Sequence, residues 1–125
     1  MARTRQQIQN EINQHQRYIS RCNQSKSNYN NSLNYAKKML SGLNASLQSL
    51  NTANDDLRKY FSIGGRAADA GAVEKLRDEV QAAIKDVNNK LIPELNSGIK
   101  ALNSAINYRN SEISKLRREL QQATE

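Results

Sequence analysis

The segment Tyr60-Phe61-Ser62-Ile63-Gly64-Gly65-Arg66-Ala67-Ala68-Asp69-Ala70-Gly71 lies close to the middle of the chain and holds three of its five glycines in 125 residues. Glycine readily adopts the backbone conformations that end a helix and reverse the chain. Long segments with helical apolar spacing run on both sides of it. We therefore predict an all-α fold in one domain, residues 1–125: a long antiparallel two-helix hairpin, resembling a coiled coil and completed by partner helices. The first helix covers about residues 4–60, the glycine turn 61–69, and the second helix about 70–122.

The first half carries one apolar row with alternating spacings of four and three residues. Thirteen of its sixteen positions are apolar or aromatic, which indicates a coiled-coil seam held over more than seven heptads. We expect a firm section of leucines next to the turn. Ser20–Tyr35 is rich in serine and asparagine, so we expect it to be helical only when packed, with fraying or mobility towards the N-terminus. The row, called here the first seam, consists of Ile8, Ile12, His15, Ile19, Cys22, Lys26, Tyr29, Leu33, Ala36, Leu40, Leu43, Leu47, Leu50, Asn54, Leu57 and Phe61.

Three polar residues interrupt this seam, namely His15, Lys26 and Asn54. Polar residues in a seam fix register and partner choice at some cost in stability, and we assign all three that role. His15 as a metal ligand or pH switch is the alternative, but no ligand partner stands at a suitable spacing. Cys22, the single cysteine, excludes an intrachain disulfide and fits the seam as a small apolar residue.

The second half resumes the apolar row and then shifts its register. Val73, Leu76, Val80, Ile84, Val87 and Leu91 form its first part, and a strict heptad follows at Ile92, Ile99, Ile106, Ile113 and Leu120, with Leu95, Leu102, Arg109 and Leu116 as companions. The shift falls between Val87 and Ile92, beside Pro93, the only proline. Because proline removes one backbone hydrogen bond, we predict a continuous helix kinked near Pro93, with a break at Asn88–Asn89 as the alternative.

Large apolar side chains also flank both seams. Flanking apolar positions indicate neighbours on more than one side of a helix, so we expect a partner helix or a second copy to cover them. The flanking residues are Tyr18, Tyr35, Met39 and Tyr60 in the first helix and Leu91, Ile92, Ala101, Ala105 and Tyr108 in the second.

The turn has its own local signals. Asp69 is a candidate N-cap for the second helix, because its carboxylate can accept hydrogen bonds from the first free amides. A phosphate cradle at Gly64-Gly65-Arg66 is disfavoured, since the glycine-rich nucleotide motifs require a preceding strand and a fixed spacing. We interpret the segment as a helical-hairpin turn.

The net charge of +7 is unevenly distributed. Residues 1–60 hold nine Lys or Arg against three acids, which leaves +1 for the rest of the chain. Such a half can attract nucleic acid, anionic lipid or an acidic protein surface, but its charges are spread out and do not form a cluster. The sequence shows neither a secretory signal peptide nor an apolar segment of membrane-spanning length. We expect a cytoplasmic protein, with any export following a route that reads no cleaved signal.

The whole chain resembles the Lap-type partner proteins encoded beside LXG-domain toxins in Gram-positive bacteria, distant relatives of the WXG-type helical hairpins. The resemblance is most specific over Leu57–Asp69, with the turn residues Phe61, Gly64, Gly65 and Asp69, and extends to Leu91–Leu95 and the isoleucine heptads. Phe61 stands in place of the WXG tryptophan. Tyr108 and Glu112 also match the Y-x-x-x-[D/E] pattern linked to type VII export, although so short a pattern often matches by chance.

The resemblance implies a non-catalytic targeting partner that binds the helical LXG domain of a toxin, usually with a second small helical protein, and promotes type VII export. The candidate seam or partner-interface residues are Leu40, Leu43, Leu47, Leu50, Leu57, Leu91, Ile92, Leu95, Ile99, Leu102, Ile106 and Ile113. Nucleic-acid or membrane binding, and self-association as a homodimer, remain the alternatives. We predict no catalytic or metal site, no cofactor and no small-molecule substrate.

Overall fold

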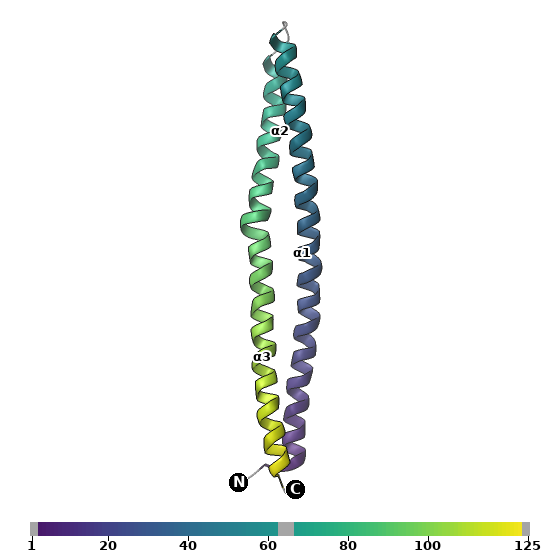
Figure 1. The fold of residues 1–125 in the computed structure, drawn as a ribbon, viewed down its shortest axis with the longest axis vertical. Helices are drawn as coiled ribbons and strands as arrows, with labels where there is room; N and C mark the ends of the chain where they lie inside the picture. Colours follow the sequence, from purple (N-terminus) through teal and green to yellow (C-terminus); the bar gives the residue numbers. More distant parts are fainter. Residues whose placement is uncertain (1–2, 63–66, 124–125) are drawn as a thin grey trace. The chain divides into compact units, whose positions relative to one another are not determined.

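The structure, a computed structural model, describes residues 3–62 and 67–123, and within 61–70 it describes no side chain. Its elements are α1 (Arg5–Ser62), α2 (Ala67–Asp86), the π-helical turn η1 (Val87–Leu91) and α3 (Ile92–Gln122) (Figure 1). No strand occurs in the described ranges, and the predicted all-α class is confirmed. Gly64 and Gly65 lie outside the described residues, and so do the side chains of Phe61 and Asp69.

The helix ends next to the turn differ from the prediction. Helix α1 continues to Ser62, and α2 already begins at Ala67, so the predicted turn of 61–69 is too long. The proposed N-cap role of Asp69 is wrong, because this residue lies inside the first turn of α2. Alanine is the strongest helix former, and the pair Ala67-Ala68 extends the helix ahead of Asp69.

The start of α1 is closed by a capping box. The Thr4 hydroxyl accepts a hydrogen bond from the Gln7 amide at 3.2 Å, and the Gln7 side-chain oxygen accepts one from the Thr4 amide at 2.9 Å. This reciprocal pair satisfies two backbone donors that the helix itself leaves free. The T-x-x-Q pattern was visible in the sequence as a helix-start signal and explains why α1 begins at Arg5.

The second half of the chain stays helical through the predicted register shift. At Val87–Leu91 the helix widens into a π turn, in which the Ile92 amide donates to the Val87 carbonyl five residues back. The additional residue in this turn accounts for the shift between Val87 and Ile92. A π turn also relieves the clash between the Pro93 ring and the carbonyl four residues earlier, so the helix avoids the alternative break at Asn88–Asn89.

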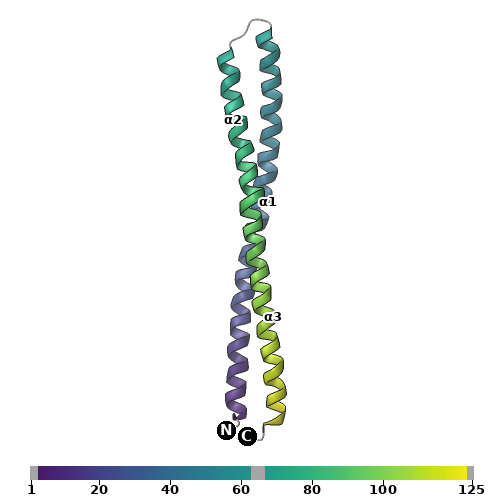
Figure 2. The same cartoon turned by 90° about the vertical axis from the view of Figure 1, so that its left-hand side faces the viewer.

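Packing divides the chain into two compact units, Met1–Asn31 with Leu95–Glu125, and Ser32–Glu94. They are called the terminal unit and the central unit. In the terminal unit the start of α1 and the end of α3 lie side by side, as the two views of Figures 1 and 2 agree. Arg3 pairs with Glu119 there, whereas Tyr29 packs over Gly98, so the two helices are antiparallel. In the central unit Arg58 pairs with Glu74, at 3.2 Å, beside the turn.

The best-buried apolar cluster lies in the terminal unit. It joins Ile8 and Ile12 of α1 to Ile113 and Leu116 of α3, with Ile19, Leu120 and Ala123 packed around it. Ile8 and Ile12 are 0% and 2% exposed. The looser packing expected for Ser20–Tyr35 stays a prediction, because this cluster lies outside that segment. Branched side chains from both helices fill this layer, and the end of the unit is closed by arginine contacts described below.

The leucine section beside the turn is less well buried. Leu40, Leu43, Leu47, Leu50 and Leu57 all belong to the seam, but each is only half-buried. Ala36 and Asn54 are the buried α1 side chains described in the central unit, and Val87 is the buried one on the opposite helix. The predicted firm section is thus only partly covered, because two helices alone cover only part of a leucine row.

Candidate functional site

The predicted seam residues form the inner faces of the two units. Every described member of the first seam is buried or half-buried apart from Tyr29, which is 38% exposed. In the second half Ile92, Leu95, Ile99, Leu102 and Ile106 are half-buried, Ile113 is buried, and Leu91 is exposed. These residues therefore pack within the chain itself. A partner has to use the side chains that the seams leave outside.

His15 belongs to a stacked polar group in the terminal unit. Its Nδ1 atom lies 3.1 Å from Nη1 of Arg109, and the Arg109 guanidinium lies 3.9 Å from the centre of the Tyr18 ring. Guanidinium nitrogens only donate, so Nδ1 accepts and the His15 proton lies on Nε2. The cation–π contact fixes Tyr18 and Arg109 against each other across the two helices. This arrangement supports the assignment of His15 as a seam residue.

The other interruptions also lie in the seam. Cys22 is buried as a free thiol, and Lys26 is half-buried. Asn54 is 2% exposed, and its Oδ1 atom has no hydrogen-bond partner among the described residues. Arg77 of α2 has a buried Nε atom that also lacks a hydrogen-bond partner among the described residues. The central unit thus carries one buried acceptor and one buried donor that are not satisfied.

One outer row of α3 differs in character from the rest of the terminal unit's surface. Gly98, Ala101, Ala105 and Tyr108 follow each other at spacings of three, four and three residues, so they share one side of the helix. Ala101 is exposed and Tyr108 is 61% exposed, whereas Ala105 and Gly98, the latter under the Tyr29 ring, are half-buried. We call this row the α3 face. It presents small side chains with an aromatic residue at one end.

The opposite flank of the same helix is polar. Its row consists of Asn96, Lys100, Asn103, Asn107 and Asn110, which are exposed apart from the half-buried Asn103. The α3 seam therefore has one apolar flank and one polar flank. Small residues let side chains or helices approach closely, and at Gly98 this room is already taken by Tyr29 of α1, whereas Ala101 is exposed.

Tyr108 and Glu112 of the candidate export pattern lie one helical turn apart on α3. The Glu112 carboxylate pairs with Lys115 at 3.3 Å, and the Glu112 side chain is 28% exposed. Tyr108 remains open to solvent at the end of the α3 face. The two side chains thus lie on the same side of the helix, as the pattern requires for joint recognition.

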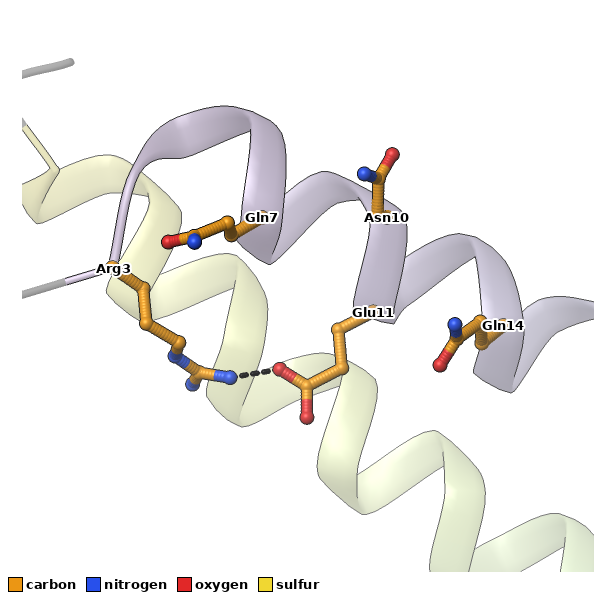
Figure 3. A pocket seen from close by; sticks show the side chains of 5 residues that line it. All are labelled: Arg3, Gln7, Asn10, Glu11 and Gln14. Atoms are coloured by element: carbon orange, nitrogen blue, oxygen red, sulfur yellow. Dashed lines mark hydrogen bonds and ion pairs between the residues drawn. The ribbon is translucent and has the colours of Figure 1, made fainter.

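The basic start of the chain is engaged within the terminal unit. Arg3 forms ion pairs with Glu11 and Glu119, and its Nε atom donates to Glu119 at 3.0 Å. The Arg3 side chain reaches Glu11 (Figure 3). A shallow hollow of about 410 Å³ lies beside this pair. The hollow is lined by Arg3, Gln7, Asn10, Glu11 and Gln14. Arg3 is the only cation among these lining residues, and the carboxylates of Glu11 and Glu119 compensate its charge. The hollow therefore offers little to an anionic ligand.

Within 3–62 and 67–123, no three His, Cys, Asp or Glu side chains gather in a way that would hold a metal ion. None of the helices in these ranges combines the length and the apolar character needed to cross a bilayer. Comparison of the chain with family models, curated proteins and solved structures gives no match.

Sequence reasoning found most of the exposed apolar residues but not their arrangement. Tyr18, Tyr35, Met39, Tyr60 and Tyr108 were predicted as flanking residues, and all five are exposed. Gly98 was missed, although its spacing to Ala101 and Ala105 was visible. The contacts of Arg3 and Arg5 with the end of α3 had no signal in the sequence, because they join residues more than a hundred positions apart.

Proposed function

We propose that this protein is a non-catalytic helical partner that binds the N-terminal LXG domain of a type VII-secreted toxin and promotes its export. The exposed part of the α3 face carries this proposal: Ala101 and Tyr108 are open to solvent, with the half-buried Ala105 between them, beside a seam that is already packed. A helix of the toxin would lie along Ala101 and Ala105 with Tyr108 as the anchor at one end. Aromatic anchors of this kind contribute strongly to protein interfaces.

The resemblance of the turn and isoleucine heptads to Lap-type proteins supplies the identity of the partner in this proposal. The half-buried leucines of the central unit add support, because an incompletely covered seam favours assembly with further helices. A second small helical protein would complete the complex. The toxic chemistry belongs to the partner, and this chain contributes helix surface only.

Co-expression with the LXG domain encoded beside this protein's gene, followed by size-exclusion chromatography, tests the proposal. The two chains should elute together. Ala101→Arg places a long cation in the middle of the α3 face and should abolish co-elution, whereas Asn107→Arg on the polar flank should leave it intact. Separate elution of the unaltered chains would refute the proposed function.

Export is tested apart from binding. If Tyr108 and Glu112 form an export signal, Glu112→Gln should reduce release of the toxin from the cells while the complex still forms, because Glu112 lies beside the docking row and not at its centre. Equal release with Glu112→Gln and with the unaltered chain would remove the signal from the proposal and leave the binding function in place.

Nucleic-acid or membrane binding receives less support from the arrangement of charge. Arg3 and Arg58 form ion pairs with acidic residues of the chain, and Arg5 binds backbone carbonyls. Part of the positive charge in the first half is thus compensated within the fold. No clustered basic row of the kind that tracks phosphates is found among the described helices.

A further inference from the structure

A second heptad row runs along the outside of α1 in the central unit. Its spacing alternates between four and three residues, as in the seam, and seven of its eight members are exposed, with Ala53 half-buried. These positions lie roughly 100° around the helix from the seam positions. We call it the outer row, and it consists of Tyr35, Met39, Gly42, Ser46, Ser49, Ala53, Asp56 and Tyr60.

The outer row is large at its ends and small in its middle. Tyr35, Met39 and Tyr60 are 71%, 52% and 62% exposed. Between them lie only small residues from Gly42 to Ala53, and a side chain added at Gly42 would meet open space. A helix crossing this row would approach closely at the centre and contact aromatic side chains where it diverges.

The other flank of the α1 seam provides an internal comparison. Its members are all exposed, and every one is polar or charged: Asn34, Lys37, Ser41, Asn44, Gln48, Asn51, Asp55 and Arg58. The two flanks of the α1 seam therefore differ in character, because only the outer row carries tyrosine and methionine. The apolar character of the outer row therefore indicates a partner on that side.

A groove lies at the centre of the outer row. It has a volume of about 530 Å³ and is lined by Ala45, Ser46, Ser49 and Leu50 of α1 and by Leu76 and Val80 of α2. Leu76 is 49% exposed at its edge. The groove is mostly apolar, and an α-helix with small side chains would fill it and cover Leu76.

The outer row is complementary to a second copy of itself that runs antiparallel, when the two copies are centred between Ser46 and Ser49. In that antiparallel register Ser46 meets Ser49 and Gly42 meets Ala53 of the other row. At the ends Tyr35 meets Tyr60, and Met39 meets Asp56. Asp56, the only charged member, then lies beside Lys38, which flanks Met39. Both the sizes and the charge of the row are thus complementary to a second copy of the same row.

We propose that two copies of this protein associate through their outer rows, with the two α1 helices antiparallel about a twofold axis between Ser46 and Ser49. Each α1 then seats its small central residues in the groove of the other copy and covers Leu76. The interface uses only the central unit and leaves the α3 face open. It therefore does not depend on the proposed function.

Sedimentation of the full-length protein across a concentration series tests this proposal. The unaltered chain should show a reversible monomer–dimer equilibrium. Ser46→Arg should raise the dimer dissociation constant by at least about tenfold, because it inserts a long cation where the helices are closest. Ser41→Arg, an equally exposed serine on the polar flank, should change the constant by less than about twofold. Circular dichroism checks that both variants remain helical.

A charge exchange tests the register. Lys38→Glu and Asp56→Lys should each weaken the dimer, because each places two like charges side by side. The two changes together should restore it, because the pair then has opposite charges again, in exchanged positions. A chain that stays monomeric throughout, a dimer that Ser41→Arg breaks and Ser46→Arg leaves intact, or a double variant as weak as the single ones would each overturn the proposed interface.

The result of the dimer test can also be distinguished from the result of the LXG-binding test. A dimer that binds no LXG domain would refute the toxin-partner role and leave the interface standing. A monomer that loses its LXG domain on Ser46→Arg would assign the outer row to the toxin and overturn the proposed dimer.

Discussion

Arg5, at the start of α1, donates a hydrogen bond from Nη1 to the backbone carbonyl of Leu120, in the last turn of α3, at 2.9 Å. The same nitrogen lies 3.4 Å from the Ala123 carbonyl. The last carbonyls of a helix lack partners within it and carry its partial negative charge, so a guanidinium satisfies both needs at once. The N-terminal arginine of one helix thus serves as the C-cap of another.

Arg5→Ala should lower the free energy of unfolding by about 1 kcal/mol, because it removes a charged hydrogen bond at an exposed helix end. The measurement is urea unfolding followed by circular dichroism. Arg17→Ala, at another exposed position of α1, is the matched control and should change stability by less than about 0.5 kcal/mol. Equal effects of the two substitutions would show that Arg5 acts by charge alone.

Gly98→Ala should destabilise the protein although alanine is the better helix former. A Cβ atom at Gly98 would lie 2.9 Å from Cζ of Tyr29 and closer still to Cε1, so the ring has to move. At Gly71 a Cβ atom would meet nothing within 4 Å, and Gly71→Ala should stabilise α2 by about 0.5–1 kcal/mol. Opposite signs in thermal unfolding are the expected result, and a gain at both positions would contradict the Tyr29 contact.

Ile12→Ala should cost about 3 kcal/mol, since Ile12 is almost fully buried in the terminal unit. Leu43→Ala should cost about 1 kcal/mol, because this leucine is only half-buried and part of its side chain already contacts water. Chemical unfolding of the two variants measures the difference. A larger loss at Leu43 would mean that the leucine section is covered in solution, as it would be in an assembly.

Asn54→Leu should raise the stability of the monomer by about 1 kcal/mol, because it replaces a buried acceptor that has no partner among the described residues by an apolar group of similar size. The expected cost is specificity, since polar seam residues restrict register and oligomeric state. Thermal unfolding measures the first effect and sedimentation the second. A lower melting temperature would indicate that Asn54 Oδ1 is satisfied by water.

The sequence by itself determined the helices and their inner faces. Heptad spacing identified the first seam, whose described side chains are buried or half-buried apart from Tyr29, and the register shift before Pro93 marked the site of the π turn. Periodicity carries this information because a helix repeats its geometry every few residues, so local spacing is sufficient to assign a face. The same reasoning named Tyr18, Tyr35 and Tyr108 as outward-facing.

Only the tertiary structure decided how well each part of the seam is buried and what the polar residues do. Leucine-rich spacing suggested a firm core beside the turn, but Ile8 and Ile12 are better buried than those leucines, because burial depends on what the opposite helix supplies at that level. Arg5 and Gly98 acquired their roles from Leu120 and Tyr29. Those partners stand far away in the sequence and meet them only once the helices pack.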